Sequence, residues 1–258
     1  MSKYIDFEDP KNRDTYVGRA ADPGWVSRFD DLVRPGGRRV ADVGCGGGIY
    51  TKAIALLGPK LVVGVDSSRL QLESAREYCR GVAHIAFLQT DAESMAAAND
   101  TFDSLVERAL IHHLGSLDRN FREALRVLKS EGTLWLQDRT VEDVLLPPSH
   151  EHIRGFYIDF DPRLRATELE RRRHEEEVTN ALLKTGFSRV HSEKIHELRK
   201  VFETSDELRD EILTRRGRSL LHGLDDGQLR ELADYVVSQI TDWPVHERDT
   251  WTVWVADK

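Results

Sequence analysis

The sequence lacks the residues that mark several classes of protein. Its 258 residues include only two cysteines, Cys45 and Cys79, too few for a disulfide framework or a cysteine metal cluster. No apolar run approaches the roughly 20 residues that a helix needs to cross a bilayer. The stretch 1–14 is polar and mixed in charge, unlike a secretory signal peptide. These absences predict a reduced, cytoplasmic protein without integral membrane association.

An excess of positive charge is also missing. Lysine and arginine number 37 against 45 aspartates and glutamates, for a net charge of −8. Proteins that hold a nucleic-acid backbone carry a broad basic field, so no nucleic-acid partner is expected. The four histidines at 112, 113, 150 and 152 follow no metal-ligand spacing, and no metal is predicted. Nothing in the sequence decides for or against a homodimer.

Glycine, by contrast, is concentrated in one place. Residues 40–51 read Val-Ala-Asp-Val-Gly-Cys-Gly-Gly-Gly-Ile-Tyr-Thr, a buried strand that runs into a glycine loop and then a helix. A plain turn needs about one glycine, whereas this loop has Gly44, Gly46 and Gly48 at alternate positions. Glycine lets a backbone turn with positive φ or meet a ligand closely. The loop therefore indicates a nucleotide-like ligand.

Strand and helix patterns alternate through the first half of the chain, which predicts a mostly parallel sheet with right-handed crossovers. The expected strands are 38–43, 61–66, 85–89, 102–107 and 133–137. A one-sided apolar pattern over 25–33 predicts a helix before the first strand, ended by Pro35-Gly36-Gly37.

The second half is less regular. Residues 138–162 are interpreted as a long irregular binding loop, and Thr167–Glu170 as a capping box that opens a charged helix to about Thr185. Arg171–Arg173 and Glu175–Glu177 are expected to form a solvated face of that helix. An edge strand within 187–202, helices opened by Thr204 and Asp225, and a final strand over 251–256 complete the prediction. The segment 215–221 is either an anion-binding lid element or a solvated turn.

Two cofactor classes use a strand, a glycine loop and a helix. The dinucleotide fingerprint requires glycines at relative positions one, three and six. Here they stand at one, three and five, and Ile49 occupies the sixth position. A bulky residue there argues against a pyrophosphate, although a nicotinamide-dependent oxidoreductase on a Rossmann-type sheet stays open as an alternative.

The pattern resembles the class I S-adenosylmethionine-dependent methyltransferases, specifically a small-molecule, type 11-like methyltransferase domain. The resemblance covers about residues 38–140. Residues 40–48 match that family's hydrophobic-hydrophobic-Asp-hydrophobic-Gly-x-Gly-x-Gly motif. Its further motifs follow in order as Asp66 after the second strand, Asp91 after the third, Arg108–Leu114 with a paired histidine after the fourth, and Glu123–Lys129 before Gly132–Leu134.

The resemblance implies an α/β, Rossmann-like three-layer sandwich. Its mostly parallel seven-stranded sheet would end in an antiparallel C-terminal strand, with a helical lid inserted near the C-terminus. The chain would be a single methyltransferase domain, 1–258. Its core would span about 36–140, 187–202 and 250–258, and its cap elements about 1–34, 138–165 and 204–242.

The same resemblance implies S-adenosyl-L-methionine as cofactor. The loop would cradle its methionine part, and Asp42 would orient the amino group. Asp66 would accept hydrogen bonds from both ribose hydroxyls, for which a carboxylate has the lone pairs, and Asp91 and Ala92 would bind the adenine. The cofactor-binding candidates are Asp42, Gly44, Cys45, Gly46, Gly48, Asp66, Ser67, Asp91, Ala92 and Arg108.

Each of these assignments has a structural alternative. Asp42 would otherwise cap the loop, Asp66 a helix and Asp91 a turn, while Cys45 fits as a small apolar filler. His113 is the candidate general base; alternatively, one of the paired histidines faces solvent and the other packs in the core. The substrate candidates are Tyr16, Arg139, Arg154 and Tyr157.

The sequence thus predicts an enzyme that moves a methyl group from S-adenosylmethionine to a small-molecule acceptor by in-line displacement. Such a reaction depends on alignment of the reacting atoms more than on acid–base help. A non-catalytic S-adenosylmethionine-binding regulator is the alternative outside enzymology. Neither the acceptor nor the methylated atom can be read from the residues.

Overall fold

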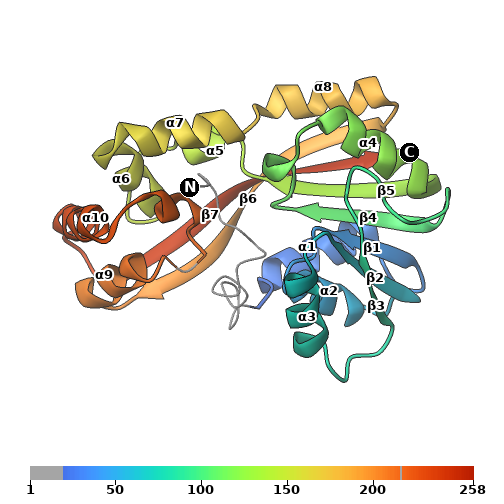
Figure 1. Cartoon of the computed structure of the whole chain (residues 1–258), viewed down its shortest axis with the longest axis horizontal. Helices are drawn as coiled ribbons and strands as arrows, with labels where there is room; N and C mark the ends of the chain where they lie inside the picture. The colour runs from blue at the N-terminus through green and yellow to red at the C-terminus, as the bar shows by residue number, and fades with distance from the viewer. Residues whose placement is uncertain (1–19, 216) are drawn as a thin grey trace. The chain divides into compact units, whose positions relative to one another are not determined.

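A computed structural model describes residues 20–215 and 217–258 (Figure 1). Its strands are β1 (Arg39–Val43), β2 (Leu61–Asp66), β3 (Ile85–Gln89), β4 (Phe102–Arg108), β5 (Leu128–Asp138), β6 (Ser188–Phe202) and β7 (Val245–Asp257). Its α-helices are α1 (Pro23–Val33), α2 (Ile49–Ala55), α3 (Arg69–Tyr78), α4 (Leu117–Val127), α5 (Val141–Val144), α6 (Ile153–Phe160), α7 (Pro162–Arg171), α8 (Glu175–Thr185), α9 (Ser205–Leu213) and α10 (Asp226–Ser238). Short 3₁₀ turns are η2 (Ile111–His113) and η3 (Ser219–Gly223).

The strands of the described chain form one seven-stranded sheet in the order β3-β2-β1-β4-β5-β7-β6. The pairs among β1 to β5 are parallel, and β7 is antiparallel to β5. This architecture confirms the predicted Rossmann-like sheet. The strand order reverses beside β1, where β2 and β4 lie on opposite sides of it. In open α/β sheets ligands bind at such a reversal, outside the carboxyl ends of the strands, and the glycine loop starts there.

The described residues group into two compact units. Residues 20–138, 174–194 and 252–258 form the sheet unit, and residues 139–173 and 195–251 the helical unit. Strands β6 and β7 contribute residues to both. The single-domain organisation with its core and cap boundaries stays a prediction.

Helices cover both faces of the sheet in the sheet unit, with α1, α2 and α3 on one side and α4 and α8 on the other (Figure 1). On one face Trp135 of β5 meets two aromatic residues of α1, with ring centroids 5.9 Å from Trp25 and 5.5 Å from Phe29. On the other face Phe121 and Leu182 are buried in the core that α4 and α8 share with the strands. The parallel part of the sheet is thus covered on both faces, and its central strands β1 and β4 are largely buried, as a covered parallel sheet requires.

The interpretation of residues 138–162 as an irregular loop was wrong. The segment contains α5 and α6, and only the part around Pro147 and Pro148 lacks regular structure. Thr140 caps α5 in a reciprocal box with Asp143, and Tyr157 of α6 belongs to the buried core of the helical unit. Both helices are too short to show a helical period in the sequence, and the two prolines between them suggest a longer break than exists.

The predicted capping box at Thr167 was also wrong. Helix α7 begins earlier, at Pro162, because Asp161 accepts the N–H of Arg163 at 2.8 Å and proline suits a first helical position. Thr167 lies inside the helix. Helix α7 ends at Arg171. Arg171 and Arg172 do not belong to a solvated helix face, because they are only 6% and 5% exposed. Gly186 does end α8 as predicted.

The remaining elements agree with expectation in type, although β5 begins at Leu128 and β7 at Val245, several residues before the strands expected at 133–137 and 251–256. β6 lies at the sheet edge, Thr204 caps α9, and Asp225 forms a capping box with Gln228 at α10. Within residues 20–215 and 217–258, no helix has both the length and the apolar character needed to cross a bilayer.

Candidate active site

The glycine loop is tied to the end of β2. The N–H groups of Gly44 and Cys45 both donate to the carbonyl of Val65, at 2.8 and 2.9 Å. Gly44 has φ +73°, and a Cβ there would lie 2.8 Å from the Cδ1 atom of Leu110, in the segment after β4. A side chain at this position is therefore excluded both by the backbone and by its neighbour.

Gly48 is the N-cap of α2 and packs directly on α3. Its φ is +82°, and an added Cβ would lie 3.0 Å from the Cβ of Ala75 and 3.1 Å from the Sγ of Cys79. The glycine at the fifth position of the loop thus permits close packing of the loop on the next helix. This packing need explains why a third glycine stands here and not one residue later.

Asp66, at the end of β2, accepts two backbone hydrogen bonds. The N–H of Gly46 donates to its Oδ2 at 2.9 Å and the N–H of Ser68 donates to its Oδ1 at 2.9 Å. The carboxylate of Asp66 therefore ties the glycine loop to the start of α3. Ser68 caps α3, while the predicted cofactor residue Ser67 is exposed and accepts from Gln89 through its carbonyl.

Asp42 is a buried carboxyl beneath the loop. It is 2% exposed, and the hydroxyl of Thr51 donates to it at 2.5 Å. Burial raises the pKa of Asp42 to about 6, with Thr51 and Arg108 opposing the rise and Asp66 adding to it. The Arg108 guanidinium lies over the ring of Tyr50 at 4.2 Å, which holds it close to the loop.

Cys45 fits its predicted place as a filler. Burial, reinforced by Asp42 and Asp66, raises the pKa of its thiol well above the usual value. The thiol therefore stays protonated at neutral pH and lacks the thiolate that nucleophilic chemistry needs.

Asp91 follows β3 and is exposed. Its Oδ1 accepts the N–H of Glu93 at 2.7 Å, so it caps a turn, as the structural alternative has it. Ala92 beside it is buried. The geometry leaves a second carboxylate oxygen for a ligand, and a role at adenine stays a prediction.

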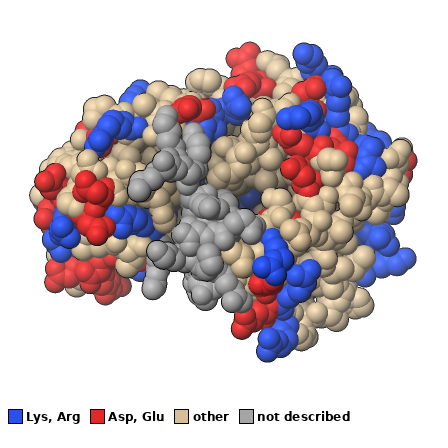
Figure 2. Space-filling model, in the orientation of Figure 1, with Lys and Arg blue, Asp and Glu red and all other residues tan. Residues whose placement is uncertain are grey.

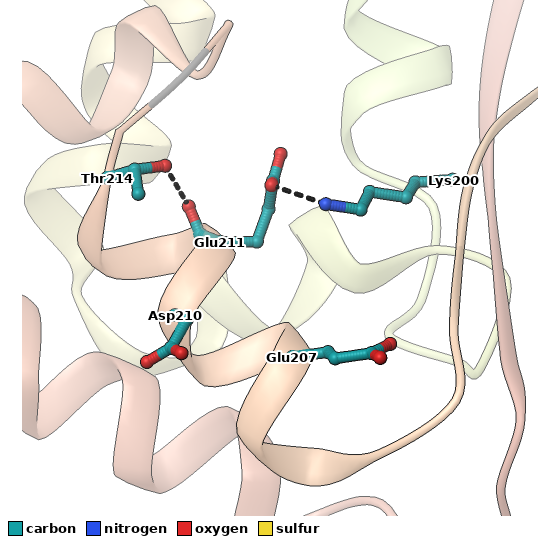
Figure 3. A pocket seen from close by; sticks show the side chains of 5 residues that line it. All are labelled: Lys200, Glu207, Asp210, Glu211 and Thr214. Carbon is teal, nitrogen blue, oxygen red and sulfur yellow. Dashed lines mark hydrogen bonds and ion pairs between the residues drawn. The ribbon is translucent and has the colours of Figure 1, made fainter.

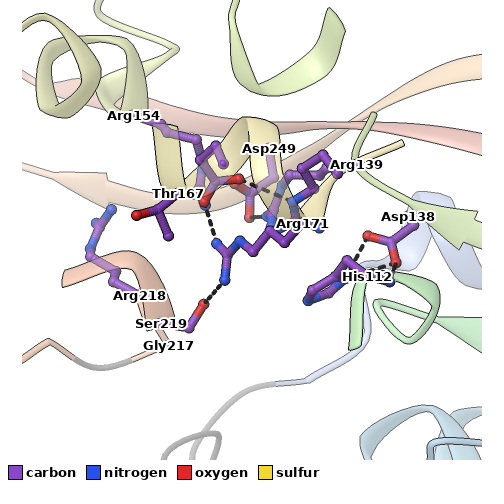
Figure 4. Close-up of polar contacts among 12 residues, drawn as sticks. His112, Asp138, Arg139, Arg154, Thr167, Arg171, Gly217, Arg218, Ser219 and Asp249 are labelled. Carbon is purple, nitrogen blue, oxygen red and sulfur yellow. Dashed lines mark hydrogen bonds and ion pairs between the residues drawn. The ribbon is translucent and has the colours of Figure 1, made fainter. Parts of the chain in front are cut away.

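The segment after β4 brings a histidine to an aspartate. Ala109 has φ +54° and its N–H donates to the carbonyl of Gln137 at 2.8 Å. In the following turn, His112 Nδ1 lies 2.8 Å from Asp138 Oδ2, with side chains 7% and 1% exposed (Figure 4). The rings of His112 and His113 are tilted against one another, with their centres 4.0 Å apart.

The aspartate partner of His112 was missed in the sequence, which pointed to His113. A usable signal was present, because β4 and β5 are adjacent parallel strands and Asp138 ends β5. Polar residues at the carboxyl ends of neighbouring parallel strands meet at one edge of the sheet.

Glu107 is a further buried acid at this edge, 0% exposed, that receives the side-chain N–H of Asn120 at 2.7 Å. Burial raises its pKa from 4.5 to about 7; Asp138 adds to the rise and Asn120 opposes it. When folding raises the pKa of an acid, the stability that this acid contributes is fully present below its pKa in the unfolded chain. That contribution is lost as the pH rises through its pKa in the folded protein.

Glu107→Gln is therefore expected to be more stable than the wild type at pH 8, by roughly 1–3 kcal/mol. The difference should shrink toward zero below about pH 4.5, where the wild-type carboxyl is neutral in both states. Urea unfolding of both proteins at pH 4, 6 and 8 measures it. A pH-independent difference would contradict the assignment.

Only three of the four substrate candidates lie among the described residues. Tyr16 lies outside the described residues, and the other three lie in the helical unit. Arg139 pairs with Asp249 at 2.6 Å and stacks on Trp251 at 3.7 Å. Arg154 pairs with Glu168 at 3.4 Å, and Tyr157 is buried. The cofactor candidates all lie in the sheet unit.

A separate open pocket of about 430 Å³ lies in the helical unit, lined by Lys200, Glu207, Asp210, Glu211 and Thr214 (Figure 3). Lys200 is paired with Glu211 there at 2.7 Å. No group of three metal-ligating side chains occurs in the described part of the chain.

The strand order, the left-handed glycines and the acid after β2 together define an α/β cofactor-binding protein of the Rossmann-like class. Residues 41–136 match the family model described as a methyltransferase domain. The match covers less than half of the chain, and over these residues the sequence is similar to methyltransferases.

The curated relatives match part of this chain. The malonyl-[acyl-carrier protein] O-methyltransferase of Legionella pneumophila is 38% identical over 98 residues, 38% of this chain and 34% of the relative. The ubiquinone biosynthesis O-methyltransferase of Mesorhizobium japonicum is 30% identical over 126 residues, 48% of each chain. The matches thus span half or less of these relatives.

Solved structures share the fold at low identity. The YcgJ protein of Bacillus subtilis has a TM-score of 0.63 and 18% identity, covering 90% of this chain and 97% of that one. Phosphoethanolamine N-methyltransferase 2 of Haemonchus contortus, solved in complex with S-adenosyl-L-methionine, has a TM-score of 0.58 and 20% identity, covering 98% and 60%.

Proposed function

We propose that the whole chain is an S-adenosylmethionine-dependent methyltransferase with a small-molecule acceptor. The observation that carries the proposal is the position of the Asp66 carboxylate, which stands at the carboxyl end of β2 and accepts the N–H of Gly46 in the glycine loop. The bound cofactor would supply an electrophilic methyl group on a sulfonium. The match to a methyltransferase family model over residues 41–136 supports the same conclusion.

The proposed roles of the residues follow from their geometry. Asp66 would bind the ribose, and the backbone of the loop at Gly44 and Gly46 would lie against the methionine part. Asp42 would orient the amino group from below, and Asp91 and Ala92 would bind the adenine. The residues after Ala109 would border the methyl group. Alignment of this kind lowers the barrier by removing the freedom of the reactants before reaction.

Calorimetry with S-adenosylmethionine tests the proposal directly. Saturable binding of one cofactor per chain is expected, followed by methyl transfer in an acceptor screen. Absence of binding at millimolar cofactor would refute it. Fluorescence titration with a nicotinamide cofactor tests the oxidoreductase alternative. Cofactor binding without turnover across a broad metabolite screen would favour the regulator instead.

We further propose that His112, held by Asp138, acts as the general base when the acceptor must lose a proton. The two curated relatives described above are O-methyltransferases, which favours an oxygen acceptor. The carboxylate of Asp138 accepts from Nδ1 and so fixes the ring and its tautomer. The geometry ranks His112 above the sequence candidate His113, whose own role stays a prediction.

His112→Gln is expected to lower kcat by about 100-fold, in the range that general-base catalysis contributes. Cofactor affinity should change little, and the acidic limb of the pH–rate profile should flatten. Asp138→Asn should give a smaller loss of the same kind. His113→Gln is the matched control. A greater loss of kcat in His113→Gln than in His112→Gln would reverse the assignment.

The partners and the cellular location of the protein are proposed from its sequence and its surface charge. Basic and acidic side chains are mixed on the face drawn in Figure 2, and the expected lack of a nucleic-acid partner stays a prediction. A cytoplasmic location, and the question of a homodimer, rest on the sequence alone and stay predictions.

A further inference from the structure

Two buried polar side chains, Glu107 of β4 and Asn120 of α4, contact each other inside the sheet unit. Both are 0% exposed, and Asn120 Nδ2 donates to Glu107 Oε2 at 2.7 Å. The other two oxygens of the pair, Glu107 Oε1 and Asn120 Oδ1, are also buried and have no hydrogen-bond partner among the described residues. The roles proposed above for the glycine loop and for His112 leave this pair unexplained.

An ionised Glu107 does not account for these contacts. A carboxylate only accepts hydrogen bonds, so both leftover oxygens would be buried acceptors without a donor, which is costly. Turning the Asn120 amide over does not help, because its oxygen would then face Glu107 Oε2 at 2.7 Å without a proton between them. A neutral carboxylic acid removes the problem, since its O–H group donates a hydrogen bond while its other oxygen still accepts one.

The strand register sets Glu107 next to Asp138. The register partners of Glu107 are apolar, Val43 in β1 and Leu136 in β5. Residues two apart on a strand point to the same face of a sheet, so Asp138 lies on the face of Leu136 and Glu107, one step nearer the carboxyl ends of the strands. Asp138 Oδ2 is 2.8 Å from His112 Nδ1 (Figure 4). Two buried acids therefore stand close to one histidine.

Two negative charges at this place are unfavourable, because a buried charge is costly and a second charge of the same sign adds repulsion. Burial raises the pKa of Glu107 to about 7; Asn120 opposes the rise and Asp138, the charged group that acts on Glu107, adds to it. A histidine partner favours the charge on Asp138, whereas the partner of Glu107 is an uncharged amide. Glu107 is thus the acid that holds its proton.

We propose that Glu107 is a neutral carboxylic acid that shares its proton with Asn120 Oδ1, and that it is a positioning residue for Asp138 and His112. In this arrangement two hydrogen bonds join Glu107 to Asn120, and both leftover oxygens gain a partner. Because Glu107 carries no charge, Asp138 is the one of these two acids that attracts the Nδ1 proton of His112, and Nε2 is the basic nitrogen. The link to His112 rests on the proposed function, whereas the protonation of Glu107 does not.

Infrared difference spectroscopy of the cofactor-free full chain tests the protonation, because a neutral carboxylic acid has a carbonyl band that a carboxylate lacks. The spectrum of the wild type at pH 6 minus that of Glu107→Gln should contain one such band. The band should fall to about half its intensity near pH 7, as the acid ionises with its pKa of about 7, and should be lost at pH 9. Absence of the band at pH 6 would overturn the proposal.

Two further variants provide the control and test the partner. Glu73 of the same unit has 41% of its side chain exposed and pairs with Arg69 at 3.1 Å. Since an exposed carboxyl is ionised at pH 6, the difference spectrum of Glu73→Gln should show no carboxylic-acid band. Asn120→Leu removes both amide atoms, so the Glu107 band should move to the higher frequency of an acid that lacks this partner. Circular dichroism checks the fold of each variant, and an unchanged band position in folded Asn120→Leu would refute the shared proton.

The Nδ1 proton of His112 reports the positioning role by NMR, and its resonance is identified by its loss in His112→Gln. In the wild type this resonance should shift between pH 6 and pH 8 with the midpoint of the infrared band, because the ionising Glu107 adds a second negative charge close to Asp138. In Glu107→Gln that component of the shift should be missing. Equal shifts in the two proteins would refute the positioning role. Neither experiment uses S-adenosylmethionine, so absence of cofactor binding would refute the proposed function and not the protonation of Glu107.

Discussion

Asp66→Ala is expected to weaken S-adenosylmethionine binding by about 100-fold or more. Two hydrogen bonds from the ribose to a carboxylate are lost, each worth about 1.5–3 kcal/mol when one partner is charged. The substitution also removes the acceptor for the Gly46 and Ser68 N–H groups at 2.9 Å, so the loop loses the contact that sets its position. Calorimetry of the purified variant measures the effect.

Two comparisons make the Asp66 result specific. Asp66→Asn keeps one oxygen acceptor and should fall between the wild type and the alanine variant. Asp118→Ala removes an exposed acid of the same unit, paired with Arg122 at 3.0 Å, and should bind normally. Full cofactor affinity in Asp66→Ala would show that the ribose is held elsewhere.

Gly48→Ala is expected to lower the free energy of unfolding by about 2–4 kcal/mol. A left-handed backbone costs a residue with a Cβ about 1–2 kcal/mol, and φ here is +82°. Contacts at 3.0 Å with Ala75 and 3.1 Å with Cys79 add overpacking strain of similar size, about 1–3 kcal/mol. Because the added methyl group would push the glycine loop away from α3, the affinity for the cofactor should fall as well.

The adjacent glycine is a matched control. A Cβ at Gly47 would meet nothing within 4 Å, and its φ lies outside the left-handed region. Gly47→Ala should therefore change stability by less than about 1 kcal/mol. Urea unfolding of the two variants compares them. If Gly48→Ala and Gly47→Ala have the same free energy of unfolding, α3 moves to make room for the added methyl group. Close packing on α3 would then not require a glycine at position 48.

Much of the sheet unit was predictable because its signals are local. A strand, a glycine loop and the start of a helix lie within a dozen residues, so β1 was predicted near its observed bounds and α2 directly after the loop. The family resemblance pointed to the acids Asp66 and Asp91, which follow the second and third strands. It did not extend to Asp138 at the end of β5, so the carboxylate partner of His112 was missed.

The helical unit was less predictable because its stability depends on contacts between residues distant in sequence. Arg171 and Arg172 look like a solvated charge run until Glu168 and the neighbouring helices enclose them. Arg218 stands in a segment interpreted as a lid element or a solvated turn, yet it is 4% exposed and bound to Glu247 in β7. Sequence spacing contains no record of such a pairing.

By itself, the sequence pointed to the cofactor class through its resemblance to the class I methyltransferases, because the motif of Gly44, Gly46 and Gly48 and the acid at Asp66 belong to one continuous stretch of chain. Only the tertiary structure decided which histidine lies against a carboxylate and that Arg171 and Arg172 are buried beside Glu168. The first relation joins side chains far apart along the chain, and burial, which gives both their energy, exists only once the chain has folded.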